Sequence, residues 1–175
     1  MSEILQLTAT ELGHAIERGD LGPVEIAKTY LDAITAHPLS PRIYSELTAD
    51  RALCEAQDAQ ERARLGLRRS PLDGVPISWK DLYDTAGIKT EAGSRLLKGR
   101  VPTKDAVVLK NATALGGVCV GKTHMSELAF SGLGLNPKTA TSPCVHDVDA
   151  VSGGSSSGAA ASVAFGLAPV AIGSD

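Results

Sequence analysis

Apolar residues recur at helical spacing along the first part of the chain and predict three helices. The first begins after Thr8, because this threonine and Glu11 have the spacing of a capping box. Pro23 opens the second helix, since proline is well tolerated at the first helical position. The third begins near Thr48, where charged residues surround an alanine stripe, a pattern typical of an outer helix. Residues 1–69 are therefore expected to form an N-terminal helical region.

From residue 70 onward, short apolar runs alternate with turn residues. The runs at 75–79, 118–120 and 169–172 predict buried strands, and the glycine, lysine and threonine at 121–123 are expected to turn the chain. Helical segments between the strands favour an α/β fold over residues 70–175. We expect a mixed β-sheet core flanked by helices.

Two helices and one long loop are expected between these strands. Asp105 is a candidate N-cap for the first helix. The apolar residues of that helix expected to point inward are Val107, Val108 and Leu115. The second helix follows a glycine- and serine-rich turn and ends near Phe165. The irregular loop at 131–150 is a candidate functional segment, because long loops inside compact domains are usually functional.

Length, charge and cysteine content narrow the class of protein. The chain has 175 residues, enough for one domain with a substantial core, and a formal net charge of −3. Nucleic acids and anionic membranes select basic surfaces, so direct nucleic acid binding is not expected. No apolar run reaches the roughly 18 residues that span a bilayer, and the start lacks the basic residues of a signal peptide. These features predict a cytoplasmic protein with no membrane contact, whose three widely spaced cysteines are buried thiols.

Candidate chemistry lies in two stretches. Residues 153–158 read Gly-Gly-Ser-Ser-Ser-Gly and open a helix, so hydroxyls and backbone N–H groups can surround a reacting atom. The same composition suits a flexible linker, although apolar blocks continue after it. Lys80 follows a buried strand, where open α/β sheets keep their sites, and burial can lower the pKa of a lysine from its usual value of about 10.4. The alternative is that Lys80 is a surface lysine paired with Asp81, although the side chains of successive strand residues point to opposite sides.

Two other constellations are weaker. His146, with Asp147 or Asp149, would complete a serine–histidine–aspartate site, but adjacent loop positions do not orient one another and the Gly-x-Ser-x-Gly spacing is absent. Residues 116–123 match Gly-x-x-x-x-Gly-Lys-Thr, yet a phosphate loop should run from strand to loop to helix. Here the first glycine ends a helix and the strand lies inside the motif, which argues against nucleotide binding.

Several motifs, in this order along the chain, resemble the amidase signature family. They are Gly-Val-Pro-Ile-Ser-Trp-Lys-Asp at 74–81, Ala-Gly-Ser at 92–94, Gly-Lys-Thr at 121–123, and the run from 153–158 through to 173–175. The resemblance implies the amidase signature fold and hydrolysis of amide C–N bonds by a Ser-cisSer-Lys triad, through an acyl-enzyme and without metal or organic cofactor. It places the catalytic lysine at Lys80 and the bridging serine, held by a cis peptide bond, at Ser155.

The sequence departs from the family pattern in two places. The family's nucleophilic serine lies in an Asp-Thr-Gly-Gly-Ser type motif, of which this chain has Asp175, so we expect the nucleophile just beyond that residue and regard 70–175 as the first part of the α/β core. Position 124, commonly Asn in the family, is His124 here. It precedes the expected substrate wall, in which Met125 and Ser131 are the predicted substrate-binding residues.

The resemblance also implies partners. These are a small-molecule amide substrate, the rest of the amidase chain, and a second copy in a homodimer. An alternative is an A-subunit-like amidotransferase component that generates ammonia from glutamine for amidation of mischarged tRNA. The triple serine resembles stand-alone amidases more than that component, in which Ser-Ser-Gly-Gly is frequent. The identity of the amide is not given by these residues, because the family builds its acyl pocket mostly from later ones.

If the nucleophile lies outside residues 1–175, this chain purified alone should not hydrolyse simple amides, because two triad members cannot form an acyl-enzyme. Ammonia release from short aliphatic and aromatic amides measures this. Hydrolysis by the 175-residue chain that survives Ser155→Ala would show that the nucleophile has been misplaced.

Overall fold

The computed structural model describes residues 2–174. The helical elements are η1 (Glu3–Gln6), α1 (Ala9–Arg18), α2 (Pro23–Ala36), α3 (Ser40–Ile43), α4 (Ala49–Arg64), η2 (Arg95–Leu97), α5 (Val107–Ala114), η3 (Glu127–Ala129) and α6 (Ser157–Ala164). The strands are β1 (Tyr44–Leu47), β2 (Pro76–Lys80), β3 (Val118–Thr123) and β4 (Ala171–Ile172). Among the residues described, no helix is both long and apolar enough to cross a bilayer. The cytoplasmic location stays a prediction.

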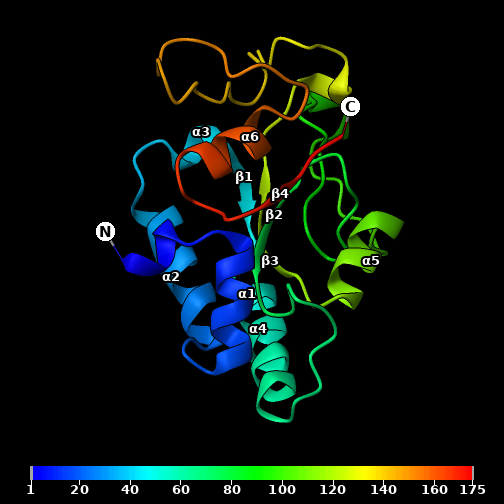
Figure 1. Cartoon of the computed structure of the whole chain (residues 1–175). Helices are drawn as coiled ribbons and strands as arrows, with labels where there is room; N and C mark the ends of the chain where they lie inside the picture. The colour runs from blue at the N-terminus through cyan, green and yellow to red at the C-terminus, as the bar shows by residue number, and fades with distance from the viewer. Residues whose placement is uncertain (1, 175) are drawn as a thin grey trace.

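The four strands form one sheet in the order β1-β3-β2-β4. The predicted mixed sheet is confirmed, and β1 is a strand that the sequence pattern did not predict. Strand β2 runs parallel to both β3 and β4, and β1 runs antiparallel to β3. Helices α1 and α2 lie on one side of the sheet and α5 on the other (Figure 1). Since β1 belongs to residues 1–69 and pairs with β3, this region is not helical throughout. The boundary at residue 70 stays a prediction.

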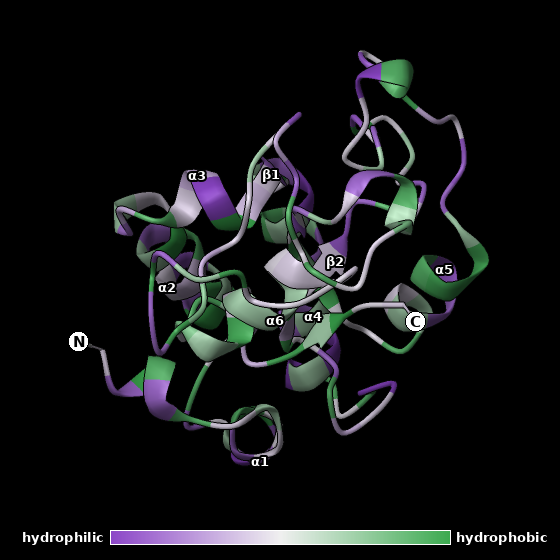
Figure 2. Cartoon of the chain, turned by 90° about the horizontal axis from the view of Figure 1, so that it is seen from above, coloured by the Kyte–Doolittle hydropathy of each residue, from purple (hydrophilic) through white to green (hydrophobic). Residues whose placement is uncertain are grey.

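The three helices predicted at the start of the chain are confirmed. The capping box of α1 is formed, with Thr8 Oγ1 accepting from the Glu11 N–H and the Glu11 carboxylate accepting from the Thr8 N–H. The alanine stripe of α4 is buried and, with α2, joins a core that includes strand β3 and helix α6. From above, α6 lies near the centre of the molecule and carries mainly pale and green residues (Figure 2). Its small side chains allow close packing between these layers.

The predicted orientation of α5 is wrong. Val107, Val108 and Leu115 are exposed, with 74%, 39% and 56% of their surface accessible, and Leu109 is the buried residue of this helix. Leu109 joins a cluster with Ile77, Trp79 and Cys119, and Ala112 of the same helix packs against that cluster, so α5 contacts the sheet through these two residues. The helix thus lies at the side of the fold, where apolar spacing alone overestimates burial.

Asp105 does not cap α5, because its carboxylate has other partners. Both oxygens accept from the Arg51 guanidinium, at 3.1 and 3.0 Å, and one also accepts from the Ala86 N–H at 2.7 Å. The N-cap residue is Ala106, without a side-chain cap. A bidentate, charge-assisted pair is stronger than a cap bond, which explains the difference.

The prediction of buried thiols is correct for one of the three cysteines. Cys119 on β3 is buried, and burial raises the pKa of its thiol to about 12. Cys54 on α4 is exposed, and Cys144, in the long loop after β3, is partly exposed. Wide spacing along the chain does not determine which face of an element a cysteine occupies.

Residues 121–123 continue strand β3, and the turn predicted there is wrong. They pair with β1 on one side and with β2 on the other, so their backbone groups are used by the sheet. Lys122 and Thr123 are fully buried. The polarity of Lys122 and Thr123 suggested a turn, but within the sheet their polar side chains have buried hydrogen-bond partners. This strand geometry is incompatible with a phosphate loop, which needs free backbone N–H groups.

A buried ion pair fixes the turn that leads into β2. Arg62 on α4 donates to the two carboxylate oxygens of Asp73 at 2.9 and 2.6 Å, and the Asp73 side chain has no solvent exposure. Gly116 comes so close to Asp73 that a Cβ atom would lie 2.1 Å from its Oδ1. Helix α4, the turn before β2 and the turn before β3 therefore meet at one carboxylate.

Arg62→Ala should lower the free energy of unfolding by roughly 3 kcal/mol, because it leaves the Asp73 carboxylate buried without its guanidinium. Arg64→Ala is the matched control on the same helix, since its pair with Glu61 is solvent-exposed and such pairs contribute little. Urea denaturation of both variants measures the difference. Equal effects of the two substitutions would contradict a structural role for the Arg62 pair.

Candidate active site

The two residues predicted to act in catalysis lie together although they are 75 positions apart. Lys80 is the last residue of β2 and is fully buried. Its Nζ donates to Ser155 Oγ at 2.5 Å and to Ser174 Oγ at 2.7 Å, and lies 3.5 Å from the Ser174 carbonyl oxygen. The site thus sits at the carboxyl end of a central parallel strand, where open α/β sheets keep their sites.

Ser155 lies in a turn held by close backbone packing. The Gly154–Ser155 peptide bond is cis. The Ser155 carbonyl accepts from the Ser126 N–H at 3.1 Å, and the Gly154 N–H donates to the Gly132 carbonyl at 2.9 Å. A Cβ on Gly154 would come within 2.8 Å of the Gly134 backbone, and a Cβ on Gly134 would lie 2.1 Å from the Gly153 carbonyl oxygen. The glycines therefore let two loops approach, and this contact positions Ser155.

The three serines of the run have different contacts. Ser155 contacts Lys80, whereas the Ser156 hydroxyl accepts from the Ser174 N–H at 3.1 Å and donates to the Ser174 carbonyl at 2.8 Å. Ser157 is fully buried at the start of α6, where its hydroxyl donates to the His124 carbonyl at 3.4 Å. Because each hydroxyl has a specific partner, the run is a structured turn and the linker interpretation is wrong.

Asp81 does not pair with Lys80. Its carboxylate accepts from Lys122 Nζ at 2.9 Å and from the Glu91 N–H at 3.1 Å. Lys80 and Asp81 are successive residues of an extended segment, so their side chains leave on opposite sides, as expected. Burial lowers the pKa of Lys122, and the nearby Asp81 carboxylate opposes that effect. The alternative interpretation of Lys80 as a surface lysine is wrong, since both lysines are buried.

The predicted wall residues lie next to this turn. Met125 is fully buried, and its carbonyl accepts from Asn136 Nδ2 at 2.8 Å. Ser131 is partly exposed, and its hydroxyl accepts from the Leu133 N–H at 3.2 Å. Burial lowers the pKa of the neighbouring His124. Among residues 2–174, no hydrogen bond joins the side chain of Met125 or Ser131 to Lys80 or Ser155, and their role in substrate binding stays a prediction.

The sequence pattern assigned no role to three residues around this site. Ser174 shares Lys80 with Ser155, and Tyr83 donates through its hydroxyl to the Gly173 carbonyl at 2.5 Å. Asn136 joins three segments, since its Nδ2 donates to the Gly93 and Met125 carbonyls while its Oδ1 accepts from the loop that follows. An Asn in a loop gives no signal of this kind. Ser174 adjoins Asp175, the expected start of the nucleophile motif, which lies outside the described residues.

The arrangement suits proton transfer through hydroxyls. A serine is a weak nucleophile until a base takes its proton, and a buried lysine can serve when its ammonium form is disfavoured. Ser155 Oγ can accept a proton from another hydroxyl while passing its own to Lys80 Nζ. Across the part of the chain that the structure describes, neither the His124 nor the His146 imidazole is hydrogen-bonded to a hydroxyl of the serine run, so geometry favours the lysine as base.

Gly134→Ala should lower the free energy of unfolding by about 2 kcal/mol or more, because Gly134 has φ +76° and an added Cβ would collide with the Gly153 carbonyl. Gly132→Ala is the control in the same loop, where a Cβ would meet nothing within 4 Å. Chemical denaturation of the two variants gives the comparison. A Gly134 variant as stable as the Gly132 variant would refute the close contact between the two loops.

Comparison with known proteins identifies the family of this chain. Residues 25–175 match the family model described as Amidase. The chain is 39% identical over 175 residues to the glutamyl-tRNA(Gln) amidotransferase A-subunit of Chloroflexus aurantiacus and 36% identical over 177 residues to that of Streptomyces coelicolor. Each match covers 100% of this chain but only 36% and 35% of the relative. The chain thus spans about a third of the length of these curated relatives.

Solved structures of two amidases resemble this chain over almost its whole length. A peptide amidase in complex with the competitive inhibitor chymostatin has a TM-score of 0.87 and 34% sequence identity, over 96% of this chain and 36% of that one. A fatty acid amide hydrolase has a TM-score of 0.89 and 28% identity, over 98% of this chain and 30% of that one. Because the family model covers residues 25–175, more than half of the chain, and the folds superpose, the chain belongs to the amidase family.

Proposed function

We propose that this chain supplies the base and the bridging serine of an amide hydrolase. The observation that carries the proposal is the buried contact of 2.5 Å between Lys80 Nζ and Ser155 Oγ. Residues 25–175 belong to the amidase family, which supports an amide as the substrate class. The proposed reaction is hydrolysis of a linear amide C–N bond.

In the proposed mechanism, a serine from the rest of the amidase polypeptide attacks the amide carbonyl. Its hydroxyl proton passes to Ser155 Oγ, and Ser155 passes its own proton to Lys80 Nζ. The tetrahedral intermediate collapses as the leaving nitrogen takes a proton back through the same path, which gives an acyl-enzyme and a free amine or ammonia. Water then attacks the acyl carbon by the same proton route, releasing the acid and restoring the serine.

The surroundings of Lys80 support its role as a base. The side chain is fully buried, and burial disfavours the ammonium form of a lysine. A neighbouring carboxylate would favour that form, but the carboxylate of Asp81 is bound by Lys122. Lys80 must be neutral to accept a proton, and burial of its side chain favours that state.

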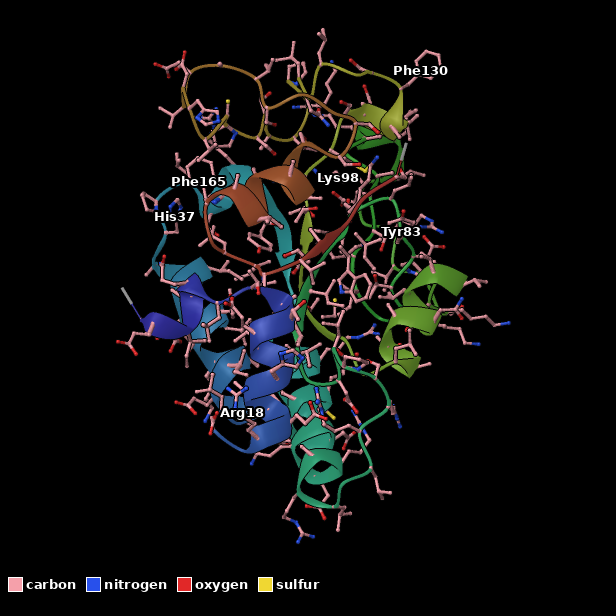
Figure 3. The ribbon with its side chains drawn as sticks, in the orientation of Figure 1. Arg18, His37, Tyr83, Lys98, Phe130 and Phe165 are labelled. Carbon is pink, nitrogen blue, oxygen red and sulfur yellow. The ribbon has the colours of Figure 1, made fainter. Side chains whose placement is uncertain are left out.

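The proposed partners are a small-molecule amide and the rest of an amidase polypeptide, with a homodimer as a further hypothesis. The matched relatives are almost three times the length of this chain, which supports a longer polypeptide as the functional unit. Leu128 and Phe130 lie between the predicted wall residues Met125 and Ser131 in the sequence and are 46% and 93% exposed. Figure 3 shows the labelled Phe130 at the outer edge of the molecule. We propose that this exposed apolar segment faces the acyl part of the substrate.

A second candidate function is an A-subunit-like component of an amidotransferase. The supporting observation is the 39% identity to the glutamyl-tRNA(Gln) amidotransferase A-subunit of Chloroflexus aurantiacus. In that case glutamine would be the amide substrate, and ammonia would pass to a partner protein that amidates mischarged tRNA. Ammonia release that depends on glutamine and on a co-purifying partner would favour this candidate, and hydrolysis of other amides without a partner would favour the hydrolase.

In the amidase polypeptide that carries this chain, Lys80→Ala and Ser155→Ala should each lower kcat by several powers of ten, because members of a catalytic set act as a unit. Ammonia release under saturating substrate measures kcat. The rate should also rise with pH as the base loses its proton.

Lys89→Ala is the control, since it removes a partly exposed lysine whose partner is Glu46. Its kcat should match that of the unmodified enzyme. A Lys80→Ala variant that keeps near-normal turnover would exclude Lys80 as the base, whatever the effect of Ser155→Ala.

A further inference from the structure

The Gly-Lys-Thr motif contains a buried lysine that the proposed mechanism does not use. Lys122 is fully buried, and its Nζ lies 2.9 Å from Asp81 Oδ1, 3.0 Å from the Tyr83 carbonyl oxygen and 2.5 Å from Thr90 Oγ1. An ammonium group has three N–H donors, so these partners satisfy all of them. Each partner belongs to the loop between β2 and η2. Lys122 therefore holds this loop from strand β3.

Tyr83 connects this loop to the segment after β4. Its N–H donates to the Lys80 carbonyl at 3.1 Å, and its hydroxyl donates to the Gly173 carbonyl at 2.5 Å. The residue therefore links the end of β2, which carries the proposed base, to a segment 90 positions later. Its backbone is held by Lys122, which fixes where the hydroxyl can reach.

The Gly173–Ser174 segment, to which the Tyr83 hydroxyl is hydrogen-bonded, contacts the proposed base. Ser174, next to Gly173, accepts from Lys80 Nζ through its hydroxyl at 2.7 Å. On its other side, Ser174 exchanges two hydrogen bonds with the Ser156 hydroxyl. A Cβ on Gly173 would lie 2.7 Å from that hydroxyl oxygen, so the segment fits tightly between Ser156 and Tyr83. A shift of the segment would change the hydrogen bonds that orient Lys80 Nζ toward Ser155.

We propose that Lys122 is a positioning residue for the Lys80–Ser155 pair, acting through Tyr83 and the Gly173–Ser174 segment. This inference rests on the proposed function and adds two residues to it. The chain of contacts runs from Lys122 Nζ to the Tyr83 carbonyl, from the Tyr83 hydroxyl to the Gly173 carbonyl, and from Ser174 to Lys80 Nζ. Lys122 also binds the Asp81 carboxylate, which keeps that charge from the proposed base.

A purely structural ion pair predicts different kinetics. If Lys122 and Asp81 only stabilise the sheet, a folded variant without the pair keeps its turnover. If Lys122 acts through Tyr83, loss of either residue lowers kcat and leaves KM unchanged, because neither side chain needs to touch the substrate. Their effects must also be non-additive, since both act on the same segment.

The test uses the amidase polypeptide that carries this chain, with Tyr83→Phe, Lys122→Met and the double variant. Tyr83→Phe removes one hydroxyl and should lower kcat about 3- to 10-fold, the range expected for one hydrogen bond, with KM unchanged. Lys122→Met should lower kcat at least as much, and the double variant should be no slower than Lys122→Met. Since Lys122→Met leaves Asp81 buried without its partner, thermal unfolding identifies the folded fraction, and Tyr83→Phe still tests the proposal if that variant fails to fold.

Lys89→Met is the matched control in the same loop, because Lys89 pairs with Glu46 and takes no part in the contacts to Gly173. Its kcat should be unchanged. Normal kcat in Tyr83→Phe, or strictly additive effects in the double variant, would overturn the inference. Failure of the proposed function is distinguished by Lys80→Ala, since an active Lys80→Ala variant rejects the base itself, whereas an inactive one with a normal Tyr83→Phe rejects only the positioning role.

Discussion

The burial of two lysines on neighbouring parallel strands is the constraint on which the rest of the site depends. An ammonium group removed from water is costly unless polar partners replace the solvent. Lys80 at the end of β2 meets the hydroxyls of Ser155 and Ser174, whereas Lys122 on β3 meets the Asp81 carboxylate. The two lysines thus differ in their surroundings, since the Asp81 carboxylate is bound to Lys122 and not to Lys80. This difference underlies the proposals that Lys80 is the base and that Lys122 is a positioning residue.

The loops around the site supply those partners, and close backbone contacts hold the loops in place. Gly134 and Gly154 bring the loop after β3 against the turn that carries Ser155, and Asn136 binds the same loop to the Gly93 and Met125 carbonyls. Small residues are needed where two backbones approach within van der Waals distance. The glycine-rich composition that suggested a linker therefore serves close packing. The helices at the start of the chain support this arrangement from the other side, through the core that α2 and α4 share with β3.

Local signals predicted the elements that depend on neighbours in sequence. The capping box at Thr8, the proline that opens α2 and the alanine stripe of α4 act within a few residues, and all three predictions are confirmed. Errors arose where a distant partner decided the outcome. Asp105 pairs with Arg51 on α4 and therefore does not cap α5, and Lys122 stays in a strand because Asp81 and Thr90 satisfy it.

The sequence by itself determined the family resemblance, the mixed α/β class and the two candidate residues Lys80 and Ser155, because each rests on residue type and order along the chain. The tertiary structure alone decided which polar groups meet. It brought Ser155 to the end of β2, assigned Asp81 to Lys122, and added Tyr83 and Ser174 around the proposed base. Pattern and propensity describe a residue's preference for helix, strand or turn. The pairing of buried charges is decided by distance in space, which requires the folded chain.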